Sequence, residues 1–508
     1  IDAGRSNLTG YEFNQTESFL QNMRMSTFNE MIADPLDAVS GSFLVAETDL
    51  FLPDVREPIR LERSYSSTRK AAGWLGKGWH FAYEGRLYED EDIIHGQLPD
   101  GFCVAFRRTG EGFQDILGNG RYALGRENGQ TEWMVADCHQ HKEYCYTGEG
   151  FLVAVTDRNG QSLVLSYRDG LLCRMQTAFG YTVDFRFRDG KLSSMQDDMG
   201  RSIKYRYTEG MLTEVVHMDG GVTKYQYSED GYLTRPIDQT GLGYLVNRYD
   251  GMGRVTFQRL ANGEEYRMTY HDRERKVCME YSACPGERQY FYNEEHVISM
   301  VVYPDGSRKS FAYDGKGNRI QETDRLGRSI CRQYDDCGRL IKETRPEGLE
   351  TCYMYDCAGD LAAVRDNGGR EKLSVYDACH NLILRKEKTA EGHYIEESYG
   401  YDHMGRLISE NDGEGHVTAY RYREDSVYPS VTVYGDGSEL ECEYSRDGRR
   451  LAEDDGAVRW EYAYNRGGYR TMERDGEGNE THFLYDGMGR KLAMYTPRQW
   501  KEKKGGRT

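Results

Sequence analysis

The feature that most constrains this chain is an aromatic residue that recurs about every 21 residues over about two thirds of its length. Successive gaps are 20, 21 or 22 residues, with one gap of 25 before Tyr401. Self-similarity at a fixed period indicates one small structural unit copied in series. Fold and function must therefore both be argued from that unit. The seventeen positions are Tyr146, Tyr167, Phe187, Tyr207, Tyr227, Tyr249, Tyr270, Tyr292, Tyr313, Tyr334, Tyr355, Tyr376, Tyr401, Tyr422, Tyr444, Tyr464 and Tyr485.

In the fullest copies the aromatic residue begins the pattern Tyr-Asp-x-x-Gly-Arg, followed by an apolar residue. Asp can bond its own backbone two residues on, and Gly supplies the positive φ that a tight reversal needs. The motif is therefore predicted to be a turn between two strands. The structural repeat residues assigned to it are Tyr249, Asp250, Gly253, Arg254, Tyr313, Asp314, Gly317, Tyr334, Asp335, Gly338, Arg339, Tyr355, Asp356, Gly359, Tyr401, Asp402, Gly405, Arg406, Tyr485, Asp486, Gly489 and Arg490.

A second turn lies midway through each copy, as in Asp157-Arg158-Asn159-Gly160. Two turns in about 21 residues leave two strands of about six residues each, which is a normal strand length. Each copy is therefore predicted to be a β-hairpin, and the seventeen copies an antiparallel meander of about 34 strands. The predicted fold class is all-β.

Many copies also read aromatic-x-aromatic before the turn, as in Tyr225/Tyr227 and Tyr353/Tyr355. Alternate residues share one face of a strand, so the aromatic residues should form two rows along one face. Cross-strand aromatic neighbours stabilise a sheet by roughly 0.2–1 kcal/mol per pair. We interpret the rows as structural, with a carbohydrate-stacking surface as the alternative.

Composition indicates a thin, curved sheet. Hydrophobic residues make up 38% of the chain and charged residues 30%, which is too polar to fill several solid cores in 508 residues. A single-layer sheet with both faces largely wet resolves this conflict. At about 4.8 Å per strand, 34 strands would run on the order of 160 Å, and long twisted sheets curl. We expect a curved or spiral wall that forms a partial hollow shell.

The net charge of −18 argues against nucleic acid and anionic membranes as partners. No apolar run approaches the length of a membrane helix. Asp-rich turns could bind Ca²⁺, but no copy keeps a dense Asp-x-Asp-x-Asp spacing. The sequence contains no Gly-x-Ser-x-Gly, His-Glu-x-x-His or phosphate-loop motif. We therefore predict no catalytic residues and no cofactor.

The twelve cysteines are interpreted mostly as free thiols. Cys331 and Cys352 occupy equivalent places in neighbouring copies, about 9.6 Å apart across two strands, beyond the roughly 7 Å that a disulfide spans. The stretch Cys138-His139-Gln140-His141 carries metal-ligand side chains. No second ligand pair follows at a recognisable spacing, so no metal site is predicted.

The chain divides into four predicted regions. Residues 1–33 are a linker or one short helix, since Phe19, Met23, Met31 and Ile32 have loosely helical spacing. Residues 34–140 are predicted to be a β capping domain, because stacked repeats need atypical ends. Residues 141–495 hold the repeats, and 496–508 form a truncated or frayed basic tail.

Two stretches together resemble one known family. Tyr-Asp-x-x-Gly-Arg-Leu at 21-residue intervals resembles the YD repeat of the RHS (rearrangement hotspot) family. Asp34-Pro35, Val39–Phe43, Arg63–Ser67 and Gly76–Trp79 resemble the domain that opens bacterial RHS toxin shells. The two matches cover roughly residues 34–495, and their co-occurrence in this order is specific.

The resemblance implies a large spiralling β-sheet shell, as in bacterial polymorphic toxins, the C component of Tc toxins and animal teneurins. In the bacterial cases the shell encloses a C-terminal toxic domain, which an aspartyl self-cleavage after the repeats releases. Neither that cargo nor the closing Asp-Pro-x-Gly-type motif is visible here, so no self-cleaving Asp is assigned.

We therefore expect a non-catalytic scaffold, the N-terminal and central part of an RHS-type secreted toxin shell. Its expected partner is the C-terminal toxin cargo, with a secretion-system component and glycans left open. The expected location is secreted or at the cell surface. The alternative is a cell-surface adhesion or carbohydrate-binding YD-repeat module.

Overall fold

The computed structural model describes residues 31–32, 35–55, 58–99, 101–110, 112–116, 120–126, 132–487 and 489–505. Within these residues the chain is almost wholly antiparallel β-structure, so the predicted all-β meander is confirmed. The helix considered within residues 1–33 lies outside the described residues, except that Met31–Ile32 form strand β1.

Two long sheets hold all the repeats. Neighbouring strands in each are consecutive in the chain, as a meander requires. The 12-stranded sheet comprises β12 (Tyr122–Arg126), β13 (Trp133–Asp137), β14 (Lys142–Tyr146), β15 (Leu152–Thr156), β16 (Ser162–Arg168), β17 (Leu171–Gln176), β18 (Thr182–Arg188), β19 (Lys191–Asp197), β20 (Ser202–Thr208), β21 (Met211–Val216), β22 (Val222–Tyr227) and β23 (Leu233–Ile237).

The 24-stranded sheet follows, and we call the two sheets together the wall. It comprises β24 (Leu245–Tyr249), β25 (Val255–Leu260), β26 (Glu265–His271), β27 (Lys276–Tyr281), β28 (Cys284–Tyr292), β29 (Ile298–Val302), β30 (Arg308–Tyr313), β31 (Arg319–Thr323), β32 (Ser329–Tyr334), β33 (Leu340–Thr344), β34 (Glu350–Tyr355), β35 (Leu361–Asp366), β36 (Glu371–Tyr376), β37 (Leu382–Lys388), β38 (Tyr394–Tyr401), β39 (Leu407–Asn411), β40 (Val417–Tyr422), β41 (Pro429–Val433), β42 (Glu439–Tyr444), β43 (Arg450–Asp454), β44 (Arg459–Tyr464), β45 (Arg470–Arg474), β46 (Glu480–Tyr485) and β47 (Lys491–Tyr495), with a 3-10 turn, η1 (Asp272–Glu274), after β26.

The wall is broken once, between β23 and β24, where a single isolated bridge joins Ile237 to Gly243. Pro236 lies in β23 and has no N–H to donate to a neighbouring strand. The expected continuous sheet is therefore two sheets in sequence.

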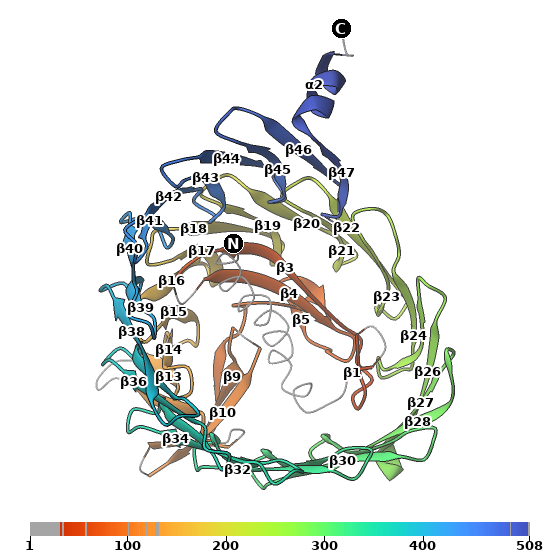
Figure 1. Cartoon of the computed structure of the whole chain (residues 1–508). Helices are drawn as coiled ribbons and strands as arrows, with labels where there is room; N and C mark the ends of the chain where they lie inside the picture. Colours follow the sequence, from red (N-terminus) through yellow and green to blue (C-terminus); the bar gives the residue numbers. More distant parts are fainter. Residues whose placement is uncertain are drawn as a thin grey trace.

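The wall curves back alongside itself. Figure 1 shows β13 to β22 running up one side and over the top, β23 to β30 descending the other side, and β32 to β47 passing again beside β13 to β22. Contacts between the two passes join residues 198 to 266 positions apart, which corresponds to about nine to thirteen repeats. The predicted spiral sheet is therefore present.

A separate N-terminal domain precedes the wall. Its strands are β2 (Leu36–Asp37), β3 (Leu44–Leu52), β4 (Ile59–Ser66), β5 (Ala72–Gly73), β6 (Gly76–Lys77), β7 (Trp79–Phe81), β8 (Leu87–Asp90), β9 (Ile93–Gln97), β10 (Cys103–Thr109) and β11 (Gly112–Asp115). The wall begins at β12, so its first strands precede residue 141, where the repeats were expected to start.

The N-terminal domain packs on a face of the wall. It lies inside the curve, with β3 and β4 against the wall (Figure 1). Trp79 contacts Tyr225 of β22, and Phe81 contacts Phe185 of β18. The apolar core follows from this packing, because its buried cluster runs from Leu36 to Val301 and includes no later described residue.

The end of the chain also differs from expectation. Residues Pro497–Gly505 form helix α2, whereas a frayed tail was predicted for 496–508. Trp500 stacks on His482 of β46 with ring centroids 3.9 Å apart, which anchors the helix to the wall. No helix among the described residues is long and apolar enough to cross a membrane.

Candidate functional site: the inner face and the seam between turns

The repeat motif builds a hydrogen-bonded turn, and the copy at Asp402 shows its parts. The Asp402 Oδ1 atom accepts hydrogen bonds of 2.9 Å from the backbone N–H groups of Met404 and Arg406. The Arg406 Nε donates to Asp402 Oδ2 at 2.7 Å. Gly405 has φ +76°, the left-handed conformation that glycine adopts without steric cost. The motif therefore closes its own turn by local bonds.

The same motif also joins each repeat to the next. The Tyr422 hydroxyl donates to the carbonyl oxygen of Leu407 at 2.7 Å, and the Arg406 guanidinium lies 4.7 Å from the Tyr422 ring centroid. Burial raises the pKa of Tyr422 to about 12, so its hydroxyl stays a donor at neutral pH. Equivalent tyrosine–carbonyl bonds are made by Tyr249, Tyr270, Tyr313, Tyr334, Tyr355, Tyr376 and Tyr485.

The other motif residues follow this plan. Asp250, Asp314, Asp335 and Asp356 each accept two backbone N–H groups, and Asp486 accepts that of Arg490. Arg254, Arg339 and Arg490 pair with the aspartate four residues earlier. Gly253, Gly317, Gly338, Gly359 and Gly489 have positive φ. Successive motif rings are two strands apart, too far to stack, so hydroxyl and guanidinium contacts hold them.

Acid should destabilise the second turn, midway through each repeat. Hydrogen bonds from the Arg328 side chain, the His416 backbone and the Asn479 side chain hold the pKa values of Asp324, Asp412 and Asp475 below the usual range. A depressed carboxyl pKa contributes stability that is present above the unfolded value near 4 and lost as pH falls through the folded value. We expect the melting temperature, followed by circular dichroism, to fall as the pH drops below about 4. A melting temperature unchanged from pH 6 to pH 3 would contradict this.

The inner face of the wall is covered in its first part. In this part, the residue that lies two positions before each motif aromatic residue points toward the N-terminal domain. Phe185, Tyr205 and Tyr225 are such residues and are 6, 4 and 3% exposed. The Tyr205 hydroxyl donates to Asp49 Oδ2 at 2.6 Å. In β18 to β22 the inner aromatic row therefore forms an interface within the chain.

The same row is half-exposed further along the wall. Tyr399 and Tyr420 occupy equivalent positions in β38 and β40, and their hydroxyls donate to Glu397 at 2.6 Å and Glu410 at 2.5 Å. Tyr462 pairs with Glu453 in the same way. Burial and the Glu397 carboxylate raise the pKa of Tyr399 to about 12. The hydroxyls of these three tyrosines are thus paired with carboxylates.

The two passes of the wall meet along a line of turns that we call the seam. Turns of β12–β23 contribute Asn159, Tyr181 and Arg201, and turns after β36, β40 and β42 contribute Asn381, Asp425 and Asp447. The shortest of these contacts is an ion pair, with Arg201 Nη1 2.6 Å from Asp447 Oδ2. These three contacts are polar, and Met404 and Val427 of the second pass also pack against the apolar core.

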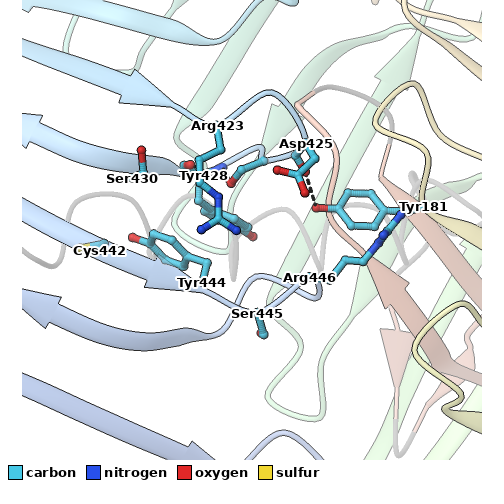
Figure 2. A pocket seen from close by; sticks show the side chains of 10 residues that line it. Tyr181, Arg423, Asp425, Tyr428, Ser430, Cys442, Tyr444, Ser445 and Arg446 are labelled. Carbon is cyan, nitrogen blue, oxygen red and sulfur yellow. Dashed lines mark hydrogen bonds between the residues drawn. The ribbon is translucent and has the colours of Figure 1, made fainter.

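A small cavity lies on the seam. Figure 2 shows Tyr181 with the Arg446 side chain beside its ring, and Arg423 and Tyr428 across the cavity. The Tyr181 hydroxyl donates to the Asp425 carbonyl oxygen at 3.4 Å. Its volume is about 90 Å³, while ligand pockets usually span about 300–1,000 Å³. The cavity has room for a few waters and not for a sugar.

A wider, open hollow of about 730 Å³ lies beside β14 to β17. Phe151, Val153, Leu165 and Tyr167 line it, with Glu149 as the one carboxylate among its lining residues. Among the residues that the structure describes, its lining holds no second acid and no histidine to pair with Glu149. The described lining is mainly apolar.

One motif glycine also contacts the N-terminal domain, and this gives a matched prediction. A Cβ on Gly253 would lie 2.5 Å from the Ser67 carbonyl oxygen, whereas one on Gly263 would meet nothing within 4 Å, and both residues have positive φ. Each alanine substitution should cost about 1–2 kcal/mol for the left-handed backbone. We expect Gly253→Ala to cost about 1–3 kcal/mol more in thermal unfolding, because the domain must shift. Equal losses would show that this contact is unimportant.

Sequence reasoning assigned the motif residues and missed the seam and the buried interface. Arg201 has a weak local signal, since it ends Asp197-Asp198-Met199-Gly200-Arg201, a motif-like turn between the regular motifs. No local sequence signal indicates the hydrogen bond between Arg201 and Asp447, which are 246 positions apart. The twelve cysteines form no disulfide with one another, and Cys331 and Cys352, argued from their spacing to be too far apart, are not bridged.

Two protein-family models match the chain. One, described as RHS Repeat, matches residues 313–350, and the other, described as a domain of unknown function (DUF6531), matches residues 33–106. The second match coincides with most of the N-terminal domain, and the first with three wall strands and part of the next. No curated protein is significantly similar to the chain in sequence.

Among solved structures, a Tc holotoxin pore of Photorhabdus luminescens is similar at 12% identity and a TM-score of 0.45, covering 87% of this chain and 26% of that one. The TcdB2–TccC3 complex gives 12% identity and a TM-score of 0.45, covering 92% and 28%. Its complex with Cdc42 gives 12% identity and a TM-score of 0.46, covering 87% and 27%. The chain thus spans about a quarter of the length of these structures.

Proposed function

We propose that this chain, which is an RHS/YD-repeat protein, is a non-catalytic scaffold whose curved wall surrounds a toxic polypeptide domain of a larger secreted protein. The cargo is the C-terminal part of that protein, and this chain is its N-terminal and central part. The role of the wall is to separate the cargo from the cytosol of the producing cell.

The observation that carries the proposal is the contrast between the two parts of the inner face. Below the N-terminal domain the inner row is buried. In β38, β40 and β44 the equivalent tyrosines are half-exposed and their hydroxyls are bonded to glutamates, while Cys442 and Phe483 hold the same place in β42 and β46 and are buried. Polar groups that are already paired offer little to an apolar polypeptide. A cargo surrounded by this face would not adhere to it.

The proposal is tested with the full-length protein that includes the cargo. We expect the C-terminal domain to arrest growth when it is expressed alone and to be tolerated behind the wall. Deleting the wall strands β24–β47 from the full-length protein should restore toxicity. A C-terminal domain that is equally toxic, or equally digested by protease, with and without the wall contradicts the proposal.

The chain described here should not retain a cargo supplied separately. The wall curves through one full circuit and part of a second, in which β32 to β47 lie beside β13 to β22 (Figure 1). We therefore expect the enclosure to be incomplete. Co-expression of this chain with the separate C-terminal domain should leave that domain open to protease. A protease-resistant complex formed in this way would show that the wall closes without further strands.

A further inference from the structure

Two consecutive repeats depart from the motif at one point on the seam. The copy that begins at Tyr355 has Asp360 where others have arginine, and the copy that begins at Tyr376 has His380 where others have glycine. His380 keeps the left-handed backbone of that glycine, with φ +60°. An L-residue pays a steric cost in this region, and His296 adopts the same backbone at the same motif position, with φ +57°.

The first pass of the wall supplies a third side chain at the same point. His141, in the turn between β13 and β14, also has a left-handed backbone, with φ +52°. Its Nε2 lies 3.2 Å from Asp360 Oδ1, and the Nδ1 of His380 lies 2.7 Å from Asp360 Oδ2. The two imidazole rings stack with centroids 3.7 Å apart. One ligand atom from each of the three residues lies within 4.8 Å of the others.

We propose that His141, Asp360 and His380 bind a divalent transition-metal ion of the zinc class, which joins the two turns of the wall. Two imidazole nitrogens and one carboxylate oxygen are donors that suit Zn²⁺, and three protein ligands leave a fourth position for water. Asp360 is 8% exposed, so its charge is held in a place where a cation stabilises it.

Binding requires one rearrangement of protons. The nitrogens that face Asp360 must be unprotonated to act as ligands, so each neutral ring carries its proton on the other nitrogen. The two rings must also turn out of their stack, because the lone pair of an imidazole nitrogen lies in the ring plane. The three ligand atoms must then close from within 4.8 Å to about 3.3 Å of one another, the separation in a tetrahedral zinc site. The ion would join His141 in the first pass of the wall to Asp360 and His380 in the second pass.

The test uses the full chain, Zn²⁺ alone, and variants that restore the glycine of the turn. His380→Gly and His141→Gly each remove a ligand at a backbone position that glycine favours. His296→Gly is the matched control, because His296 has φ +57° in a comparable turn and lies outside the cluster. All three variants are expected to fold.

We expect the wild-type chain to bind one Zn²⁺ by calorimetry and to melt at a higher temperature with it. Loss of either histidine should weaken binding by more than about 100-fold, since even outer-shell partners of metal ligands are worth 10–100-fold. His296→Gly should bind as the wild type does. Absence of binding, or equal binding by His380→Gly, overturns the proposal.

The twelve free cysteines require a second readout. Co²⁺ bound at the proposed site has nitrogen and oxygen ligands, so its spectrum should lack a thiolate charge-transfer band. Such a band at one equivalent of Co²⁺ would place the metal on cysteines and contradict the assignment. Because metal binding is measured on this chain without cargo, its failure and the failure of the shell proposal are distinguishable.

Discussion

Replacing Arg63 with alanine is expected to lower the free energy of unfolding by about 3–5 kcal/mol, because the change leaves a buried carboxylate without its partner. Arg63 is 0% exposed and forms ion pairs with Asp49 and Glu47. Its Nη2 also donates to the Tyr225 hydroxyl of the wall at 3.0 Å. The guanidinium therefore joins β3, β4 and β22 at the centre of the buried interface.

Thermal and urea unfolding of the full chain measure this loss. Arg206→Ala is the control, because Arg206 pairs with Glu214 while its side chain is 64% exposed. Exposed pairs contribute about 0–1 kcal/mol, so this variant should unfold nearly as the wild type does. The double variant Arg63→Met with Asp49→Leu should recover part of the loss, since it removes the uncompensated charge. Similar losses for Arg63→Ala and Arg206→Ala would contradict a buried network.

Trp79→Ala is expected to cost about 3–5 kcal/mol, the range for deleting a fully buried large aromatic side chain. The Trp79 ring centroid lies 5.3 Å from that of Tyr65 and 4.9 Å from that of Tyr225, and its exposure is 0%. Its Nε1 donates to the Tyr227 hydroxyl at 2.9 Å. The side chain therefore carries much of the contact between the N-terminal domain and the inner face.

Trp460→Ala is the matched control for that variant. Trp460 lies in β44, in the part of the wall beyond the apolar core, and is half-buried. We expect it to cost about 1 kcal/mol, because less apolar area leaves water there on folding. Limited proteolysis should also cut the N-terminal domain faster in Trp79→Ala than in Trp460→Ala. Equal stability and equal cleavage would show that Trp79 does not hold the domain in place.

The local structure of the wall could be predicted from the sequence because its bonds are local. Asp402, Gly405 and Arg406 lie within five residues and close their turn among themselves. Strand length, hairpin pairing and the polar character of the sheet follow from the same repeat. The helix at Pro497–Gly505 was not predicted, because its sequence has no helical pattern of apolar residues. The helix is anchored by the stacking of Trp500 on His482, a residue of strand β46.

The N-terminal domain shows where prediction from local pattern ends. The strands of this domain were expected from the sequence, and Arg63–Ser67 was part of the motif that suggested the family. The position of the domain on the inner face of the wall was not expected. Nothing local to Arg63 indicates that Tyr225, 162 residues away, will meet it. That contact depends on how the wall curves around the domain.

The sequence alone determined that this chain is a meander of hairpins with polar faces, since a 21-residue period with Asp-Gly turns permits little else. Only the tertiary structure decided which turns meet across the seam. Each repeat adds a small rotation, and the sum over about eleven repeats brings His141 to Asp360 and His380. A small difference in rotation per repeat would pair other turns, and no short segment of the sequence encodes that sum.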